Sequence, residues 1–144
     1  MNYHQIFEII GQLLIMYIVF RLLSKFVVNY DFFTEQEDPY LTSLKDELSV
    51  LDPKLRDIKL YVGDKSYTIN KKKIYICLKD ENGEYYQRNM LVYCIIHEYG
   101  HVLCEEIGHT ELFFDIFQGL LKQAELRGLY DPSIPPITNY CGMT

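Results

Sequence analysis

The feature that most constrains the fold is a pair of histidines four residues apart, His97 and His101, with Glu98 directly after the first. Residues 90–96, which precede this HExxH motif, are almost all apolar, as in a helix that is buried along its length. On such a helix, residues four apart lie on nearly the same face and about 6 Å apart along the axis. Both imidazoles can therefore reach one metal ion, while Glu98 lies beside it.

The motif predicts a catalytic zinc site with one Zn²⁺ per chain. Catalytic zinc commonly takes three protein ligands and a water, and it lowers the pKa of that water to about 7. Glu98 is placed to accept a proton from the water as the catalytic general base. The three histidines outside the N-terminal segment all lie within residues 97–109, which favours a shared site over separate core positions.

His109 is the predicted third zinc ligand. Glu105 lies on the same helix face as the motif but about 12 Å along the axis from its first histidine, too far for one ion. The chain must turn first, and Gly108 allows a turn directly before His109. Glu111 and Asp115 of the next helix are the alternative ligands. In another interpretation, His109 is only a solvated residue at the start of that helix.

Four further residues have less specific patterns. Cys94 lies on the metal-facing side of the helix, although a small core residue explains it better than a ligand. Tyr130 and Tyr140 lie in a tail that can fold back over the site, where a tyrosine hydroxyl can stabilise a developing oxyanion. Packing is the alternative for both tyrosines. Cys141 in the same tail would be a fourth ligand in a purely structural zinc site.

The pattern outside the motif predicts an α+β domain. A helix begins at Asp38-Pro39, carries Leu41, Leu44, Leu48 and Leu51 on one face, and ends at Asp52-Pro53. Three β-rich runs follow, at residues 58–62, 66–70 and 73–78.

Two longer helices complete the expected domain. The motif helix is expected from about residue 87 to residue 106, and Thr110 is expected to cap a further helix that ends near Arg127, before Gly128. Residues 131–136 hold three prolines and are expected to be extended. The four cysteines form no CxxC pair, so they are expected to be free, largely buried thiols in a reducing compartment.

Residues 6–28 form an apolar stretch long enough to span a membrane. Arg21 and Lys25 lie near one end, where long cationic side chains can reach the membrane surface. We therefore expect a single-pass anchor at residues 1–28, with the domain at residues 29–144 on the cytoplasmic side. An amphipathic or buried core helix is the alternative. A cleaved signal peptide fits less well, because residues 1–5 hold no Lys or Arg.

The charge balance disfavours nucleic acid as a partner. The chain has 14 Lys and Arg against 20 Asp and Glu, a net charge of −6. Without residues 1–28, which hold two basic residues and one acidic residue, 12 basic residues face 19 acidic ones, a net charge of −7. Sequence-independent binding of nucleic acid depends on a basic surface. The single basic run, Lys71-Lys72-Lys73, is interpreted as a solvated hairpin tip.

The motif and the residues after it resemble a known family. With HExxH at residues 97–101, Gly108-His109-Thr110 and Phe113-Phe114, the chain resembles small zincin-like metallopeptidases of the WLM and SprT-like kind over roughly residues 58–142. It looks closest to uncharacterised members encoded by large DNA viruses, which carry stretches like residues 128–132 and 139–142.

The resemblance implies a minimal zincin-like fold: a helix, a small antiparallel sheet, the HExxH helix and a further helix. It implies that His97, His101 and His109 bind zinc and that Glu98 is the catalytic base. It also suggests a viral protein in a host-cell or virion membrane. These families are linked to proteolysis of DNA-bound proteins, a context that the net charge of −7 does not support.

The predicted function is zinc-dependent hydrolysis of peptide bonds in a protein or peptide substrate. Glu98 is expected to deprotonate the water and later to protonate the leaving amine. The substrate is expected to pair with an edge strand, for which Lys73–Leu78 is the candidate. The alternatives are a membrane-anchored zinc-binding pseudo-peptidase that acts as an interaction module, and a membrane or virion structural protein with an accidental motif. No oligomeric state is predicted.

Overall fold

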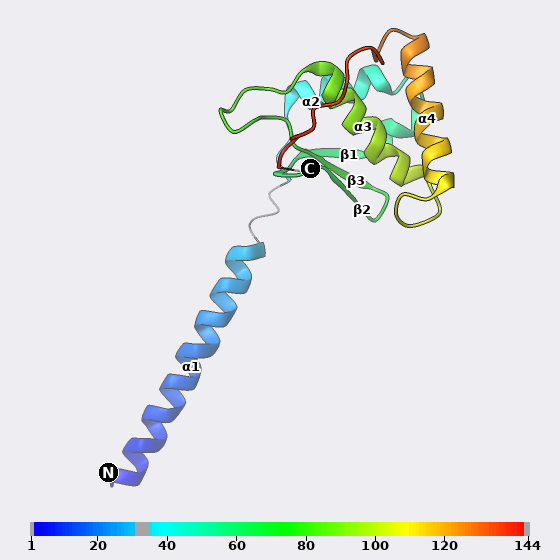
Figure 1. Cartoon of the computed structure of the whole chain (residues 1–144). Coiled ribbons are helices and arrows are strands. Elements are labelled where there is room, and N and C mark those ends of the chain that lie inside the picture. The colour runs from blue at the N-terminus through cyan, green and yellow to red at the C-terminus, as the bar shows by residue number, and fades with distance from the viewer. Residues whose placement is uncertain (1, 31–34, 143–144) are drawn as a thin grey trace. The chain divides into compact units, whose positions relative to one another are not determined.

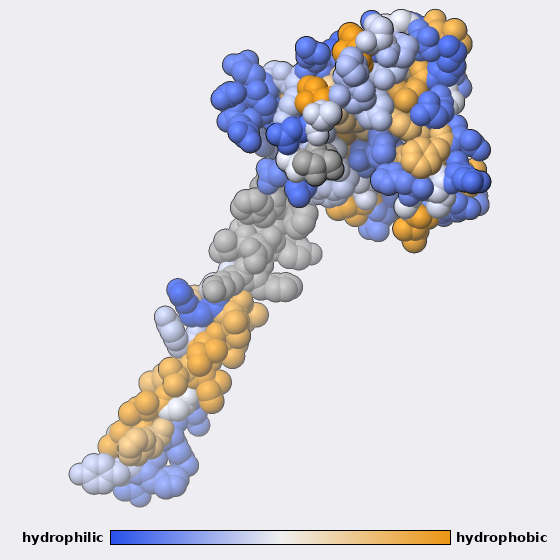
Figure 2. Space-filling model, in the orientation of Figure 1, coloured by the Kyte–Doolittle hydropathy of each residue, from blue (hydrophilic) through white to orange (hydrophobic). Residues whose placement is uncertain are grey.

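The computed structural model describes residues 2–30 and 35–142, which fall into two units, Met1–Glu35 and Gln36–Thr144. In the described part of the first unit the chain forms one helix, α1 (Tyr3–Tyr30). Its 22 residues from Tyr3 to Ser24 are long and apolar enough to cross a membrane, a test that a signal sequence also passes. No part of this apolar segment is buried, and Figure 2 shows apolar side chains along most of its length.

The second unit begins with α2 (Pro39–Leu48), where the sequence predicted a helix. The Asp38 carboxylate accepts hydrogen bonds from the backbone N–H groups of Tyr40 and Leu41, at 2.8 and 3.3 Å, and so satisfies two donors that the first turn leaves free. The predicted apolar face is buried through Leu41, Leu44 and Leu48. A short 3₁₀ helix, η1 (Pro53–Asp57), follows and was not predicted.

Three short strands form one sheet: β1 (Lys59–Val62), β2 (Tyr67–Ile69) and β3 (Lys73–Ile76), in the order β1-β3-β2. Strand β3 runs antiparallel to β2 but parallel to β1, so the expectation of an antiparallel sheet is wrong for one of the two pairs. The buried β3 takes the centre of the sheet. Strands β2 and β3 form a hairpin along one edge of β3. Strand β1 pairs with the other edge of β3 and runs in the same direction as β3.

The strand register gives the sheet two different faces. Leu60, Ile74 and Thr68 are register partners on one face, and Thr68 contacts α3 (Arg88–Leu103). Tyr61, Tyr75 and Tyr67 are partners on the other face, where the rings of Tyr67 and Tyr75 stack with their centroids 4.8 Å apart. Cross-strand aromatic pairs of this kind stabilise small sheets.

Helices α3 and α4 (Glu111–Leu126) pack against each other, and α3 also contacts the sheet (Figure 1). Thr110 caps α4 as predicted, since its hydroxyl accepts the Phe113 N–H at 3.3 Å. Helix α3 ends at Leu103, three residues before the predicted end at residue 106. The loop that follows contains Gly108, whose φ of +87° is a conformation that glycine adopts at little cost.

The turn between β2 and β3 reaches the C-terminal end of α3. Asn70 and Lys71 both have left-handed backbone conformations, with φ of 51° and 55°, and the Lys72 N–H bonds the Ile69 carbonyl oxygen, as in a turn whose two central residues have positive φ. The Lys71 ammonium donates a hydrogen bond of 2.6 Å to the carbonyl oxygen of Cys104. Lys71 and Lys72 are exposed in this hairpin turn, as expected, and Lys71 makes this additional contact with the end of α3.

The C-terminal tail is not extended over its whole predicted range. The Asp131 carboxylate accepts hydrogen bonds from the backbone N–H and the hydroxyl of Ser133, and the Asp131 carbonyl accepts the N–H of Ile134. These local bonds fold residues 131–134 into a turn, since a short polar side chain can satisfy nearby backbone donors. Asn89 of α3 holds the turn through bonds to the backbone of Asp131.

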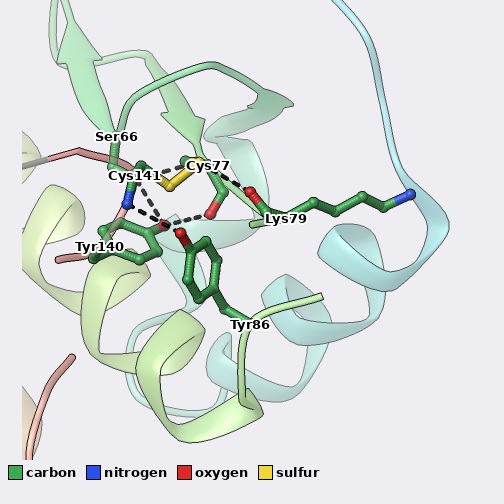
Figure 3. The surroundings of a disulfide bond; sticks show 6 residues. All are labelled: Ser66, Cys77, Lys79, Tyr86, Tyr140 and Cys141. Carbon is green, nitrogen blue, oxygen red and sulfur yellow. Dashed lines mark hydrogen bonds between the residues drawn. A yellow bond between two sulfur atoms is a disulfide. The ribbon is translucent and has the colours of Figure 1, made fainter. Parts of the chain in front are cut away.

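A disulfide joins Cys77 to Cys141, so the expectation of four free thiols is wrong for these two (Figure 3). Cys77 directly follows β3, and the tail returns to it across a separation of 64 residues. A pairing over this distance depends on the path of the tail in the fold, which cysteine spacing does not reveal. Cys94 and Cys104 are free and buried, as expected.

Candidate metal centre

Three histidine side chains meet at the C-terminal half of α3. His97 and His101 lie on α3, and His109 comes from the loop between α3 and α4. The Nε2 atom of His109 lies 3.0 Å from that of His97 and 3.2 Å from that of His101. One ligand atom from each residue lies within 4.8 Å of the others, so the predicted triad is brought together.

These separations fit a tetrahedral metal ion. Two nitrogens bound to Zn²⁺ at about 2.0–2.1 Å in tetrahedral geometry lie about 3.3 Å apart. The two printed Nε2 separations of 3.0 and 3.2 Å are close to that value. Three histidines also form the donor set of an open catalytic zinc site, in which the fourth position is left for water.

Phe113 of α4 holds the three imidazoles in place. Its ring is fully buried and stacks on that of His101, with 4.2 Å between centroids and 19° between planes. It also meets the rings of His97 and His109, at centroid distances of 5.0 and 4.9 Å. A Cβ at Gly100 would lie 3.1 Å from the Phe113 ring, so the glycine inside the motif permits this close packing.

Glu98 lies beside the triad with only 7% of its surface exposed. The Thr68 hydroxyl of β2 lies 2.8 Å from Glu98 Oε2 and 3.0 Å from the Glu98 carbonyl oxygen, and its one hydrogen can be donated to either. Burial raises the pKa of the Glu98 carboxyl, and the bond from Thr68 partly offsets this effect. A carboxylate with a raised pKa and a fixed orientation suits a general base.

His97 and His101 are held in the neutral state that metal binding needs. The pKa of His97 is lowered to about 4. Burial is the main cause, and the neighbouring His101 and His109 contribute to the same shift. The pKa of His101 is lowered as well, by burial and by His109. Neutral imidazoles at physiological pH are ready to act as ligands.

Metal-free protein is expected to lose stability on mild acidification because of His97. The unfolded chain binds a proton near the ordinary pKa of 6.5, whereas folded His97 stays neutral down to about pH 4. The free energy of unfolding therefore falls as the pH drops through this interval. Thermal unfolding of chelator-treated wild type and His97→Gln tests this, with a smaller loss expected for the variant. The raised pKa of Glu98 has the opposite effect on the free energy of unfolding, and it has this effect in both proteins. Equal losses in the two proteins would therefore contradict a lowered pKa for His97.

The structure places the other candidate ligands outside the triad. Glu105, Glu111 and Asp115 are all exposed, and none joins the group of ligand atoms found among the described residues. Cys94 is a buried core residue, and burial raises the pKa of its thiol to about 12. Cys141 is bonded to Cys77.

The two candidate oxyanion tyrosines lie in different surroundings. Tyr140 lines the cleft of the triad, and its hydroxyl donates to the Cys77 carbonyl oxygen and lies 3.0 Å from Ser66 Oγ (Figure 3). Tyr130 lines a separate cavity, and its ring is 6.2 Å from that of Tyr93.

The comparisons place this chain beside viral proteins. It is 48% identical over 90 residues to uncharacterized protein 136R of Invertebrate iridescent virus 6, a match that covers 60% of this chain and 51% of that protein. It is 44% identical over 88 residues to uncharacterized protein 042R of Invertebrate iridescent virus 3, covering 60% and 55%. The chain thus spans about half the length of these two relatives.

A third relative matches more of the chain at lower identity. Uncharacterized protein R325 of Acanthamoeba polyphaga mimivirus is 27% identical over 135 residues, which is 87% of this chain and 68% of that protein. No family model matches the chain, and no solved structure matches it.

A cleft of about 930 Å³ opens over the triad. One side is formed by β2 and the residues next to it, Ser66 to Thr68 and Asn70-Lys71, and the floor is one face of α3. The C-terminal residues Pro136 to Thr138 and Tyr140 complete the lining. The sequence pointed to Tyr140, in a tail able to fold back over the site. It indicated no role for Thr68 or for Pro136 to Thr138, because these residues meet α3 only through tertiary contacts.

Proposed function

We propose that this chain is a membrane-anchored zinc metallopeptidase with a zincin-like active site. The observation that carries the proposal is the convergence of three histidine Nε2 atoms beside the buried Glu98 carboxylate. A structural zinc site usually has four protein ligands, whereas three histidines with an adjacent carboxylate suit catalysis.

Glu98 supplies the proton transfers of the proposed reaction. A zinc ion bound by His97, His101 and His109 would polarise the carbonyl of the peptide bond and acidify a water. Glu98 accepts the proton of that water and later delivers a proton to the leaving amine. Thr68 orients Glu98 for both steps, through the short contact to its Oε2 atom.

The substrate chain is proposed to lie along β2. In the described sheet β2 has a neighbour only on its β3 side, and its residues line the cleft. An extended peptide can add to such an edge through backbone hydrogen bonds. The expectation that Lys73–Leu78 is the edge strand is wrong, because β3 pairs with strands on both sides.

The alternative, a zinc-binding pseudo-peptidase, has less support. A fourth protein ligand such as Cys141 would favour it, but Cys141 is bonded to Cys77. It also gives no role to Glu98, which is buried and hydrogen-bonded beside the triad.

We further propose that α1 anchors the domain in a membrane as a single span, with the domain exposed to an oxidising environment. The apolar segment Tyr3–Ser24 supports the span. Arg21 and Lys25 favour the cytoplasmic side, but two charges are a modest bias. The Cys77–Cys141 disulfide points to an oxidising environment and is the stronger constraint. Nucleic acid is not a proposed partner, given the net charge of −7 outside residues 1–28.

The proposed activity is tested with the full chain in detergent micelles, loaded with zinc and mixed with a pool of unstructured peptides. We expect new peptide termini by mass spectrometry, their loss on chelation and their return when zinc is restored. A zinc-loaded, folded protein that leaves every peptide intact would contradict the proposal.

A further inference from the structure

The cleft continues beyond the triad along one face of α3. Met90, Tyr93, Cys94, His97 and His101 all line it, at spacings that place them on the same side of the helix. Tyr93 and Met90 precede His97 by four and seven residues, so they lie about 6 and 10 Å from it along the axis. An extended peptide advances about 3.3 Å per residue, so these side chains lie within reach of residues two or three positions from the bond above the triad.

Residues 136–141, which we call the C-terminal strap, close this part of the cleft. The backbone N–H of Ile137 lies 3.3 Å from the Met90 sulfur. The Tyr140 hydroxyl meets Ser66 Oγ at 3.0 Å and so joins the strap to the residues before β2.

The strap is fixed at its end as well. The backbone N–H of Cys141 donates to the Tyr86 hydroxyl at 3.1 Å, and the disulfide ties Cys141 to Cys77 (Figure 3). The strap is thus held in place at Ile137, Tyr140 and Cys141.

Charge is distributed unevenly along the cleft. Lys71 and Glu106 line the part of the cleft near the C-terminal end of α3, where the Lys71 ammonium donates a hydrogen bond to the Cys104 carbonyl oxygen. The lining beyond the triad toward the N-terminus of α3 holds no charged residue among those described: Met90, Tyr93, Cys94, Pro136, Ile137 and Tyr140. Ile137 remains 39% exposed, so its side chain is available for contact with a ligand.

We propose that the C-terminal strap is the specificity-determining wall of the cleft, and that the space between Ile137 and the Met90–Tyr93 face takes a large apolar side chain of the substrate. This inference rests on the proposed peptidase function and names its substrate class: peptides with Leu, Phe or a similar residue close to the cleaved bond. Burial of such a side chain against Met90 and Ile137 removes apolar surface from water, whereas a carboxylate there would lose its hydration without a partner.

Ile137→Asp and Ile134→Asp form a matched pair of variants for the test. Ile134 is 40% exposed and lies in the same tail, but it lines the separate cavity that also contains Tyr130. Zinc-loaded full-length proteins in micelles receive peptides that differ only at the positions two or three residues from the cleaved bond, where they carry Leu, Phe, Asp or Lys. For wild type and Ile134→Asp we expect kcat/KM for the Leu and Phe peptides to exceed that for the Asp peptide by about 10–200-fold. Ile137→Asp should lose most of this preference while unfolding at the temperature of Ile134→Asp.

A binding readout separates this inference from the peptidase proposal. Fluorescent Leu and Asp peptides are titrated into Glu98→Gln and into Glu98→Gln with Ile137→Asp, both zinc-loaded. Tighter binding of the Leu peptide that is lost in the double variant supports the strap as the specificity wall, even if wild type cleaves nothing and the peptidase proposal fails. Cleavage without apolar preference, or a preference unchanged by Ile137→Asp, overturns the inference and leaves the peptidase proposal standing. A wild type that cleaves no peptide, with Glu98→Gln showing no binding preference, overturns both.

Discussion

Glu98→Gln is expected to abolish peptide hydrolysis while leaving zinc bound. The amide keeps the size of the side chain and can still interact with the Thr68 hydroxyl, but it cannot accept the proton of the attacking water. Loss of a general acid–base group typically lowers the rate by about 10²–10⁴-fold. The measurement is kcat on one cleaved peptide, with zinc content and thermal unfolding recorded on the same samples.

Glu105→Gln is the control for this variant. Glu105 is close in sequence but exposed, so its substitution removes the same charge without altering the buried carboxylate. We expect its kcat to match wild type. If Glu98→Gln kept full activity with zinc bound, Glu98 would not be the base.

Loss of the disulfide is expected to destabilise the domain strongly. The bond closes a loop across 64 residues, and for a loop of that size the chain-entropy relation gives about 4 kcal/mol. We therefore expect the Cys77→Ser, Cys141→Ser double variant to lose about 2–5 kcal/mol of unfolding free energy. Equilibrium unfolding in denaturant measures this difference.

Reductant provides the matched comparison for the disulfide. It should lower the stability of wild type toward that of the double variant and leave the double variant unchanged, since Cys94 and Cys104 are free. Two of the four thiols should also resist alkylation in denatured, unreduced wild type. Four reactive thiols, or equal stability of both proteins without reductant, would contradict the bond.

The parts of the fold that sequence predicts well are those encoded locally. Asp38-Pro39 and Thr110 are helix caps, and a cap depends on a side chain and the backbone two or three residues away. The joint placement of His97 and His101 follows from the pitch of one helix. His109 followed from a distance limit on Glu105 and from the glycine before it, which adopts the required positive φ.

The parts that were missed depend on contacts between distant segments. Thr68 reaches Glu98 across 30 residues, and Cys141 reaches Cys77 across 64. The central position of β3 likewise depends on which strands pair, and short β-rich runs do not specify their partners. Local sequence patterns carry little information about such pairings, so apart from the expectation that the tail with Tyr140 can fold back over the site, the walls of the cleft came from the structure.

The most direct test of a three-histidine zinc centre is the zinc content per chain of purified full-length protein, measured by elemental analysis. We expect about one zinc per wild-type chain and per Glu111→Ala chain, and a large loss in His109→Ala, because removing one of three ligands weakens the site severely. Glu111 is the matched control, since it is exposed, lies two residues away and was the alternative ligand. A folded wild type that holds no zinc after the metal has been supplied would contradict the central claim.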